Sequence, residues 1–314
     1  MIVERIAAAT RLSPHYVRLI ARTASYRYKV YQIPKKSGGM RVIAHPARVL
    51  KLFQYWLIEN VLSLLPVHPS ATAYAKHTNI RDNAAVHCKQ NFLLRIDFKE
   101  FFTSIGGADV DVLLAKNSGV FGSPLSGEDR HVIRQLVCRR DALSIGAPSS
   151  PIISNAVMFE LDSRWYRHCR NLGVVYTRYA DDIYCSTGEP EVLAVLLGEI
   201  RRDLAENESP RLVINETKTT FVSRKRRKLV TGLVVTPEGR VSLGRKRKRY
   251  IRGLVCKYIG NRLEESKRAY LRGFIAYAQS VDAAFVVGLI RKYGGEVIDA
   301  IRRGPPGGKD NPTV

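Results

Sequence analysis

The chain has 314 residues, enough for about two domains, and its 45% hydrophobic and 25% charged residues are typical of a globular protein. The 51 Lys and Arg against 28 Asp and Glu give a formal net charge of +23, which indicates a polyanionic partner such as nucleic acid. No apolar run reaches the roughly 18 to 20 residues of a membrane span. The five cysteines form no CxxC pair, which argues against a zinc site and suits a reducing cytoplasm. We therefore expect a cytoplasmic protein without a membrane partner.

Local sequence patterns predict a mixed set of helices and strands. In chain order we expect helices within 1–25, a β-hairpin over 28–44, a helix over 47–65, a strand at 92–97, helices over 127–139 and 151–171, a strand–turn–strand over 174–187, a helix over 190–206, short strands between 211 and 243, and helices from 245 to about 303. Strands and helices do not alternate regularly, which favours an α+β fold with an antiparallel sheet. Residues 305–314 are rich in Gly and Pro, and we expect a disordered tail there.

The positive charge is concentrated in the last third of the sequence. Residues 224–272 contain 17 Lys or Arg against three Glu, a local net charge of +14. Tyrosines are interleaved with these cations, and aromatic rings can stack on unpaired bases while cations meet phosphates. This segment is the strongest candidate for contact with nucleic acid.

Three carboxylates stand at the expected ends of neighbouring strands. Asp181 and Asp182 lie between two apolar stretches that can pair as a hairpin, and Asp97 ends the apolar strand at 92–97. A bare Asp-Asp pair is usually a polar turn, but the flanking β-branched and aromatic residues and the third carboxylate favour a functional site. Adjacent carboxylates repel one another unless a cation lies between them, and oxygen ligands suit Mg²⁺. The pattern predicts a two-metal site for phosphoryl transfer.

At these residues the sequence resembles reverse transcriptases. Tyr179-Ala180-Asp181-Asp182 resembles their YxDD motif. Other segments resemble further family motifs in the family's order: the fingers hairpin at 33–46, the first catalytic-Asp motif at 95–105, the motif SIGAPSSPIISN at 144–155 and the Lys-bearing motif NETKT at 215–219.

Two further elements resemble those of retron reverse transcriptases. Asn83-Ala84-Ala85-Val86-His87 resembles their NAxxH element, and Val230-Thr231-Gly232 resembles their VTG element. Either element alone is a weak signal. The roles of Asn83 and His87 are open between a packed pair that supports the palm and a contact with RNA.

The resemblance implies roles at the metal site. Asp97, Asp181 and Asp182 would be catalytic and would hold two Mg²⁺ ions, with the Phe98 carbonyl assisting and Asp182 in a supporting role. Lys218 would protonate the leaving pyrophosphate, although a structural ion pair is an equal alternative. A positioned general acid contributes about 10²–10⁴-fold to a rate.

The resemblance also implies a binding site for the incoming dNTP. Its expected residues are Lys35, Lys36, Arg41, Phe102 and Gly146. Arg41 matches the geometry of phosphate, and Phe102 would pack against the sugar and exclude a 2′-hydroxyl, unless it belongs to the core. Ile145 departs from the family, where a Gln that contacts the incoming nucleotide is common, and its side chain cannot donate a hydrogen bond.

The resemblance implies that the RNA-binding residues are Arg245, Lys246, Arg247, Lys248, Arg249 and Arg252.

The implied fold is a right-hand polymerase whose palm is an antiparallel sheet backed by helices. We expect fingers with N-terminal helices at 1–91, the palm at 92–235 with interleaved fingers helices at 106–145, and a helical, RNA-binding thumb at 236–304. The expected activity is RNA-directed DNA synthesis that makes a short single-stranded DNA from the protein's own structured noncoding RNA. Priming would start at an RNA 2′-hydroxyl.

Antiphage defence is the expected setting, with dNTPs, the RNA and its cDNA, a separate effector protein and a cellular RNase H as partners. One alternative is a stand-alone reverse transcriptase of group II or diversity-generating type. Another, from a different class, is a non-catalytic RNA-binding protein on a polymerase fold. This last alternative predicts that Asp181→Asn leaves biological function intact.

Overall fold

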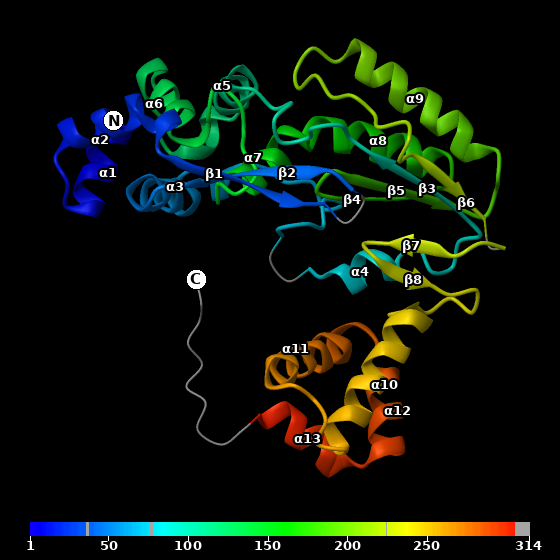
Figure 1. Ribbon diagram of the computed structural model, residues 1–314. Helices are drawn as coiled ribbons and strands as arrows, with labels where there is room; N and C mark the ends of the chain where they lie inside the picture. Colours follow the sequence, from blue (N-terminus) through cyan, green and yellow to red (C-terminus); the bar gives the residue numbers. More distant parts are fainter. Residues whose placement is uncertain (36–37, 76–77, 224, 305–314) are drawn as a thin grey trace. The chain divides into compact units, whose positions relative to one another are not determined.

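The computed structural model describes residues 1–35, 38–75, 78–223 and 225–304, so Lys36 and the tail expected at 305–314 lie outside the described residues. The chain forms two compact units (Figure 1). The first unit combines Met1–Thr78 with Phe92–Phe221, and the second combines Asn79–Asn91 with Val222–Val314. Residues 79–91 belong to the second unit because they pack with strands that follow residue 222.

The first unit contains the predicted hairpin, strand and catalytic-turn segments. Its helices and strands are α1 (Ile2–Thr10), α2 (Pro14–Arg22), β1 (Tyr28–Pro34), β2 (Met40–Pro46), α3 (Arg48–Asn60), β3 (Phe92–Asp97), α5 (Gly107–Lys116), α6 (Gly127–Val137), α7 (Ser150–Val157), α8 (Phe159–Asn171), β4 (Val175–Tyr179), β5 (Asp182–Thr187), α9 (Val192–Glu206) and β6 (Thr220–Val222). Ser13 caps α2 as its sequence predicts, accepting a hydrogen bond from the Tyr16 amide. The single helix expected at 151–171 is divided at Met158.

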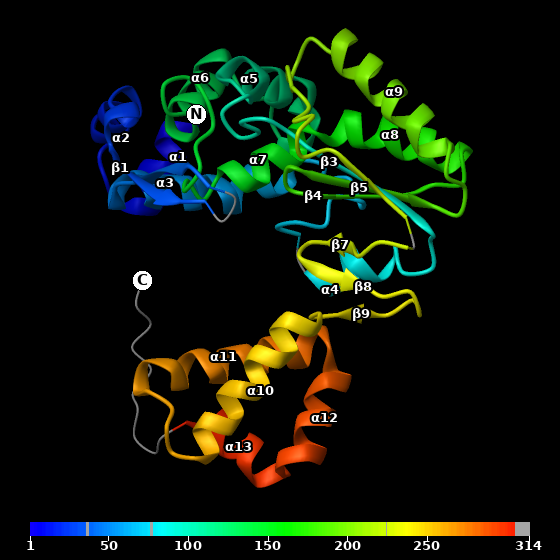
Figure 2. The same cartoon turned by 45° about the vertical axis from the view of Figure 1, so that its right-hand side comes forward.

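The central sheet has four strands in the order β4-β5-β3-β6. Strands β3 and β4 both pair antiparallel with β5, which confirms the expected antiparallel sheet. Helices α8 and α9 lie on one face of this sheet (Figures 1 and 2). Alternate residues such as Leu94, Ile96 and Ile183 enter the core beneath those helices. Because side chains alternate along a strand, Arg95 and Asp97 project from the opposite face.

The second unit joins a short N-terminal segment to the C-terminal helices. It consists of α4 (Ile80–Ala85), β7 (Lys228–Val230), β8 (Leu233–Val235), β9 (Val241–Ser242), α10 (Arg245–Ile259), α11 (Glu265–Val281), α12 (Ala283–Tyr293) and α13 (Gly295–Arg303). Strands β7, β8 and β9 form an antiparallel sheet, and α4 packs against β8. Within the described ranges of both units, no helix is long and apolar enough to cross a membrane.

Candidate active site

The turn between β4 and β5 presents two adjacent carboxylates. Tyr179 pairs with Asp182, so Ala180 and Asp181 form a two-residue loop. Ala180 has a φ of 56°, as the first position of a tight hairpin turn requires. The strand–turn–strand prediction for residues 174–187 is confirmed, and the turn fixes where Asp181 and Asp182 stand.

Asp97 lies directly across from Asp182 in the pairing of β3 with β5. Its carboxylate is almost fully buried and accepts hydrogen bonds from Lys218 Nζ at 3.0 Å and Asn215 Nδ2 at 3.1 Å. The Asn215 amide also donates to the Asp97 carbonyl at 2.7 Å. The segment 215–219 is therefore anchored on Asp97, with which Lys218 forms an ion pair.

Asp182 is held by two residues that the sequence analysis did not single out. Arg95 donates to Asp182 Oδ1 through Nε at 3.0 Å and Nη2 at 2.8 Å, and the Tyr184 hydroxyl donates to Oδ2 at 3.1 Å. Charge-assisted bonds of this kind are about twice as strong as neutral ones. Asp182 thus already has a cationic partner, whereas Asp181 does not share it.

Asp181 lies in surroundings that disfavour the charged form of its carboxyl group. Burial, followed by the charges of Asp182 and Asp97, raises the pKa of the Asp181 carboxyl. A cation beside Asp181 would oppose all three effects.

Asp97 and Asp181 offer hard oxygen donors that fit Mg²⁺. A cation would compete with Lys218 for Asp97 Oδ1. Across the ranges that the structure describes, no group of three or more His, Cys, Asp or Glu stands close enough to hold a metal ion. In this structure the bonds from Arg95 and Tyr184 engage both oxygens of Asp182.

The segment after α6 packs against the β1–β2 hairpin. The Ala44 amide donates to the Ile145 carbonyl at 2.8 Å. Gly146 has a φ of +111°, and a Cβ there would stand 2.9 Å from the Ala44 carbonyl oxygen. Only glycine fits this close approach without strain. Gly146 therefore maintains the packing of this segment against β2.

The remaining residues of the expected nucleotide site differ in surroundings. Arg41 and Lys35 are exposed at the end of the hairpin. Phe101 is buried in the core, whereas Phe102 is only partly buried and meets Phe101 edge-on at 5.4 Å between ring centres. Tyr74 is an addition that the sequence did not suggest. Burial and then the charge of Asp181 raise the pKa of Tyr74, while Arg41 lowers it, so this tyrosine lies near both.

The two short retron-like elements pack together in the second unit. Thr231 Oγ1 donates to the Ile80 carbonyl at 3.0 Å, which joins the β7–β8 turn to the start of α4. Thr231 and Gly232 have φ values of 48° and 76°, a pair of positive values that a type I′ hairpin turn requires. The Val-Thr-Gly sequence is therefore the turn itself.

Asn83 and His87 are both buried, but only Asn83 lies within a helix. Helix α4 ends at Ala85, and His87 lies in the turn that follows. Burial and the nearby charge of Lys228 lower the pKa of His87 to about 3. His87 is therefore neutral at physiological pH, in a packed environment.

The basic residues of α10 are not equivalent. Arg245, Lys246, Arg249 and Arg252 are exposed. Lys248 is only partly exposed and pairs with Asp282 at 2.7 Å, so it fastens α10 to the start of α12. Arg247 is exposed and also donates to the Gly232 carbonyl at 3.0 Å.

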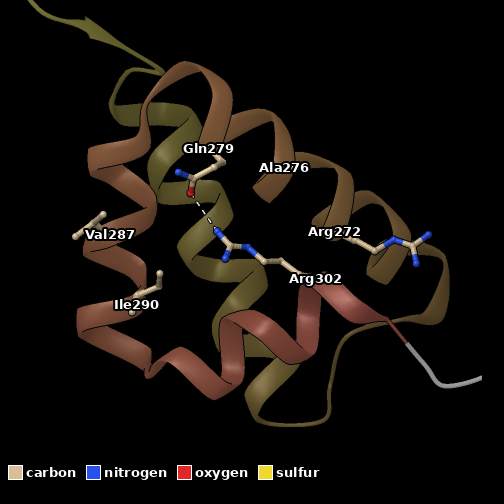
Figure 3. Close-up of a pocket in the computed structure, with 6 residues that line it drawn as sticks. All are labelled: Arg272, Ala276, Gln279, Val287, Ile290 and Arg302. Atoms are coloured by element: carbon tan, nitrogen blue, oxygen red, sulfur yellow. Dashed lines mark hydrogen bonds between the residues drawn. The ribbon is translucent and has the colours of Figure 1, made fainter.

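A concave surface between α11, α12 and α13 is lined by Arg272, Ala276, Gln279, Val287, Ile290 and Arg302 (Figure 3).

The chain belongs to the reverse transcriptase family. The family model described as "Reverse transcriptase (RNA-dependent DNA polymerase)" matches residues 33–260. The telomerase of Candida tropicalis shares the fold, with a TM-score of 0.50 and 14% identity over 75% of this chain and 53% of that one. The protein is accordingly an RNA-directed DNA polymerase, of a class that depends on metal ions.

Within this family the chain is of the retron type. It is 34% identical to the retron Ec83 reverse transcriptase of Escherichia coli over 94% of this chain and 96% of that protein. The retron Ec86 and Ec73 enzymes of the same species are 33% and 36% identical, over 92% and 86% of this chain and 89% and 88% of theirs.

Proposed function

We propose that this enzyme makes a short single-stranded DNA from its own structured noncoding RNA, starting from a 2′-hydroxyl of that RNA. The observation that carries this proposal is the full-length similarity to retron reverse transcriptases. The packing of the β7–β8 turn onto α4 supports it, because both retron-like elements belong to one folded unit. We further propose antiphage defence with a separate effector as its setting, and RNase H of the cell as the enzyme that trims the template.

Asp97 and Asp181 are proposed to bind two Mg²⁺ ions, with the Phe98 carbonyl as a further donor and Asp182 in support. When bound, these ions activate the attacking hydroxyl and stabilise the leaving pyrophosphate. Arg95 would keep Asp182 in place through the two bonds described above. Lys218 is proposed to move from Asp97 to the leaving group and protonate it.

The similarity to reverse transcriptases also suggests how the chain divides into fingers, palm and thumb. Fingers would correspond to 1–91 and to the helices within 106–145, the palm to the rest of 92–235, and the thumb to 236–304. Lys35 and Arg41 would contact the triphosphate, with Phe102 and Gly146 beside the sugar and base. The exposed cations of α10, Arg245, Lys246, Arg247, Arg249 and Arg252, would bind RNA, with Lys248 mainly supporting the helix.

Nucleic acid that copurifies with the protein tests the proposal. The chain is expressed from its native locus, and the bound nucleic acid is run on a denaturing gel before and after RNase. The matched control is Asp181→Asn with Asp182→Asn, which keeps side-chain size and removes both charges. We expect a discrete DNA band that shifts after RNase and is missing from the control.

Other outcomes separate the alternatives. Primer extension on supplied RNA without a copurifying DNA would indicate a stand-alone reverse transcriptase. A protein that binds RNA and keeps its biological function in the double variant would indicate a non-catalytic role.

A further inference from the structure

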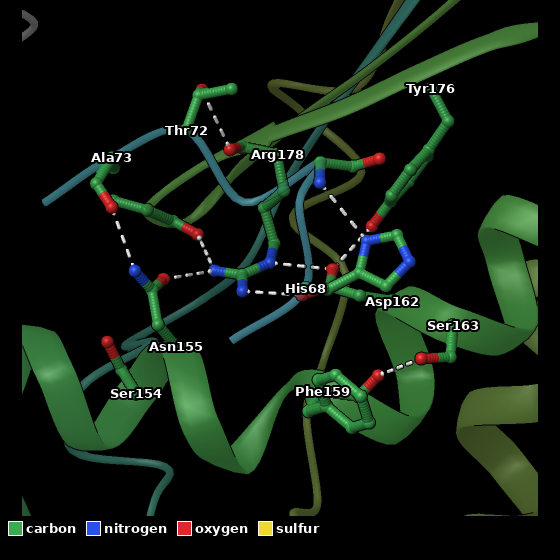
Figure 4. Close-up of polar contacts among 12 residues, drawn as sticks. His68, Thr72, Ala73, Ser154, Asn155, Phe159, Asp162, Ser163, Tyr176 and Arg178 are labelled. Atoms are coloured by element: carbon green, nitrogen blue, oxygen red, sulfur yellow. Dashed lines mark hydrogen bonds and ion pairs between the residues drawn. The ribbon is translucent and has the colours of Figure 1, made fainter. Parts of the chain in front are cut away.

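A buried ion pair lies beneath the catalytic turn, on the face of the sheet opposite the carboxylates. Arg178 of β4 and Asp162 of α8 are both fully buried. Arg178 Nη2 donates to Asp162 Oδ2 at 2.6 Å, and Nε donates to Oδ1 at 2.8 Å (Figure 4). The Tyr176 hydroxyl adds a third bond to Asp162 at 2.6 Å. The carboxylate thus accepts three hydrogen bonds, all from side chains of the strand that leads into the turn.

The other side of the guanidinium reaches the turn itself. Arg178 Nη1 donates to the Ala180 carbonyl at 3.0 Å and to Asn155 Oδ1 at 3.1 Å. Asn155 Nδ2 in turn donates to the Ala73 carbonyl at 2.8 Å. The Ala180–Asp181 peptide is therefore linked through one side chain to α7, α8 and the segment before Tyr74.

Stability alone does not account for this arrangement. Burying two charges costs several kcal/mol per ion, and replacing such a pair with apolar residues is often neutral or stabilising. The main chain of Arg178 is already fixed, because its amide donates to the Ser70 carbonyl and its carbonyl accepts from the Thr72 amide, each at 2.8 Å. What the side chain adds is a bond to Ala180, whose φ of 56° is uncommon for a residue with a Cβ.

We propose that Arg178, held by Asp162 and Asn155, is a positioning residue that fixes the Ala180 carbonyl and thereby aims Asp181 and Asp182. The guanidinium is suited to this task because its planar fork can bind a carboxylate with one edge and two oxygens with another. A lysine can preserve the charge pair but cannot make all four bonds. The proposal depends on the polymerase activity and not on self-priming, so it is tested on a supplied RNA template and DNA primer.

The principal variant is Arg178→Lys, assayed by single-nucleotide primer extension. Misplacing reacting groups by 1 Å can cost about 100-fold in rate, so we expect kcat to fall by about 100-fold while the KM for dNTP changes less than about threefold. Hydrogen–deuterium exchange of the free protein gives a readout independent of activity. We expect amides of residues 179–183 to exchange at least about tenfold faster, because the turn opens more often.

Two controls separate positioning from general destabilisation. Tyr176→Phe removes one bond to Asp162 but keeps the bond between Arg178 and Ala180. Asp129→Asn alters another buried carboxylate, which accepts from the Ile2 amide and from Ser126. Both controls should keep kcat within about threefold of the parent and leave exchange at 179–183 unchanged.

The proposal fails if folded Arg178→Lys keeps kcat within about threefold of the parent, or if exchange of the turn is unaltered. If Arg178→Lys does not fold, the apolar triple Asp162→Leu, Tyr176→Phe, Arg178→Met carries the test, since it leaves no unpaired charge. A folded triple with parental kcat and turn exchange would overturn the proposal. A triple with slow synthesis and a loosened turn would support it.

Discussion

The buried histidine of the second unit makes its stability depend on pH. The pKa of His87 in the folded chain is about 3, whereas an unfolded histidine titrates near 6.5. Below pH 6.5 the unfolded state therefore binds a proton that the folded state does not, and stability falls as pH falls. Below pH 6.5, each further drop of one pH unit lowers the free energy of unfolding by about 1.4 kcal/mol, until His87 also protonates in the folded state near pH 3.

Lowering the pH from 7 to 5 should destabilise the second unit by about 2 kcal/mol, or increase its unfolded population roughly 25-fold. Hydrogen–deuterium exchange of amides in β7 and β8, corrected for the intrinsic effect of pH on exchange, measures this opening. His87→Gln should abolish the dependence, because residues 79–91 and 222–314 contain no other histidine. His15→Asn, at an exposed position of α2, is the control. A parallel loss of protection in His87→Gln and the parent would refute the reasoning.

Three further predictions follow from the site and from α10. Gly146→Ala should lower the free energy of unfolding by about 1–3 kcal/mol, because alanine is strained at a positive φ, and it should raise the KM for dNTP. Chemical denaturation would measure the first effect and primer extension the second. Unchanged values would contradict the close approach of Gly146 to Ala44. Phe102→Ala should raise ribonucleotide use relative to deoxyribonucleotide use, and unaltered selectivity in competition assays would place Phe102 in the core. The affinity for RNA should fall as the salt concentration rises. The double variant Lys246→Gln, Arg249→Gln should reduce the slope of log K against the logarithm of the salt concentration by about 1.4. An affinity that does not change with salt would exclude phosphate contacts by this helix.

The elements that could be predicted from sequence are those encoded locally. The β4–β5 turn follows from two apolar stretches around Asp181 and Asp182, and Ser13 marks the start of α2. Arg95 could also have been found, because it lies two residues before Asp97 and therefore on the same face of β3. The hydrogen bonds from Arg95 to Asp182 depend on the register between two strands, since the two residues are 87 positions apart in the sequence.

Other features depend on contacts that no local pattern records. The pairing of Asp162 with Arg178 requires knowing that α8 covers β4. The grouping of residues 79–91 with the C-terminal unit is one such feature, since the NAxxH and VTG elements are about 150 positions apart and meet only through folding. The ion pair of Lys248 was likewise hidden within a run of cations that otherwise face solvent.

The discontinuity of the second unit has a consequence for synthesis on the ribosome. Lys228 donates to the Gln90 carbonyl across a separation of 138 residues. At about 5–20 residues per second, the ribosome adds that many residues in roughly 7–28 s. During this interval the segment 79–91 has emerged without the strands that bury it. The second unit is therefore completed only after the intervening residues of the first unit have been made, and until then the segment that contains Asn83 and His87 lacks the strands that bury it.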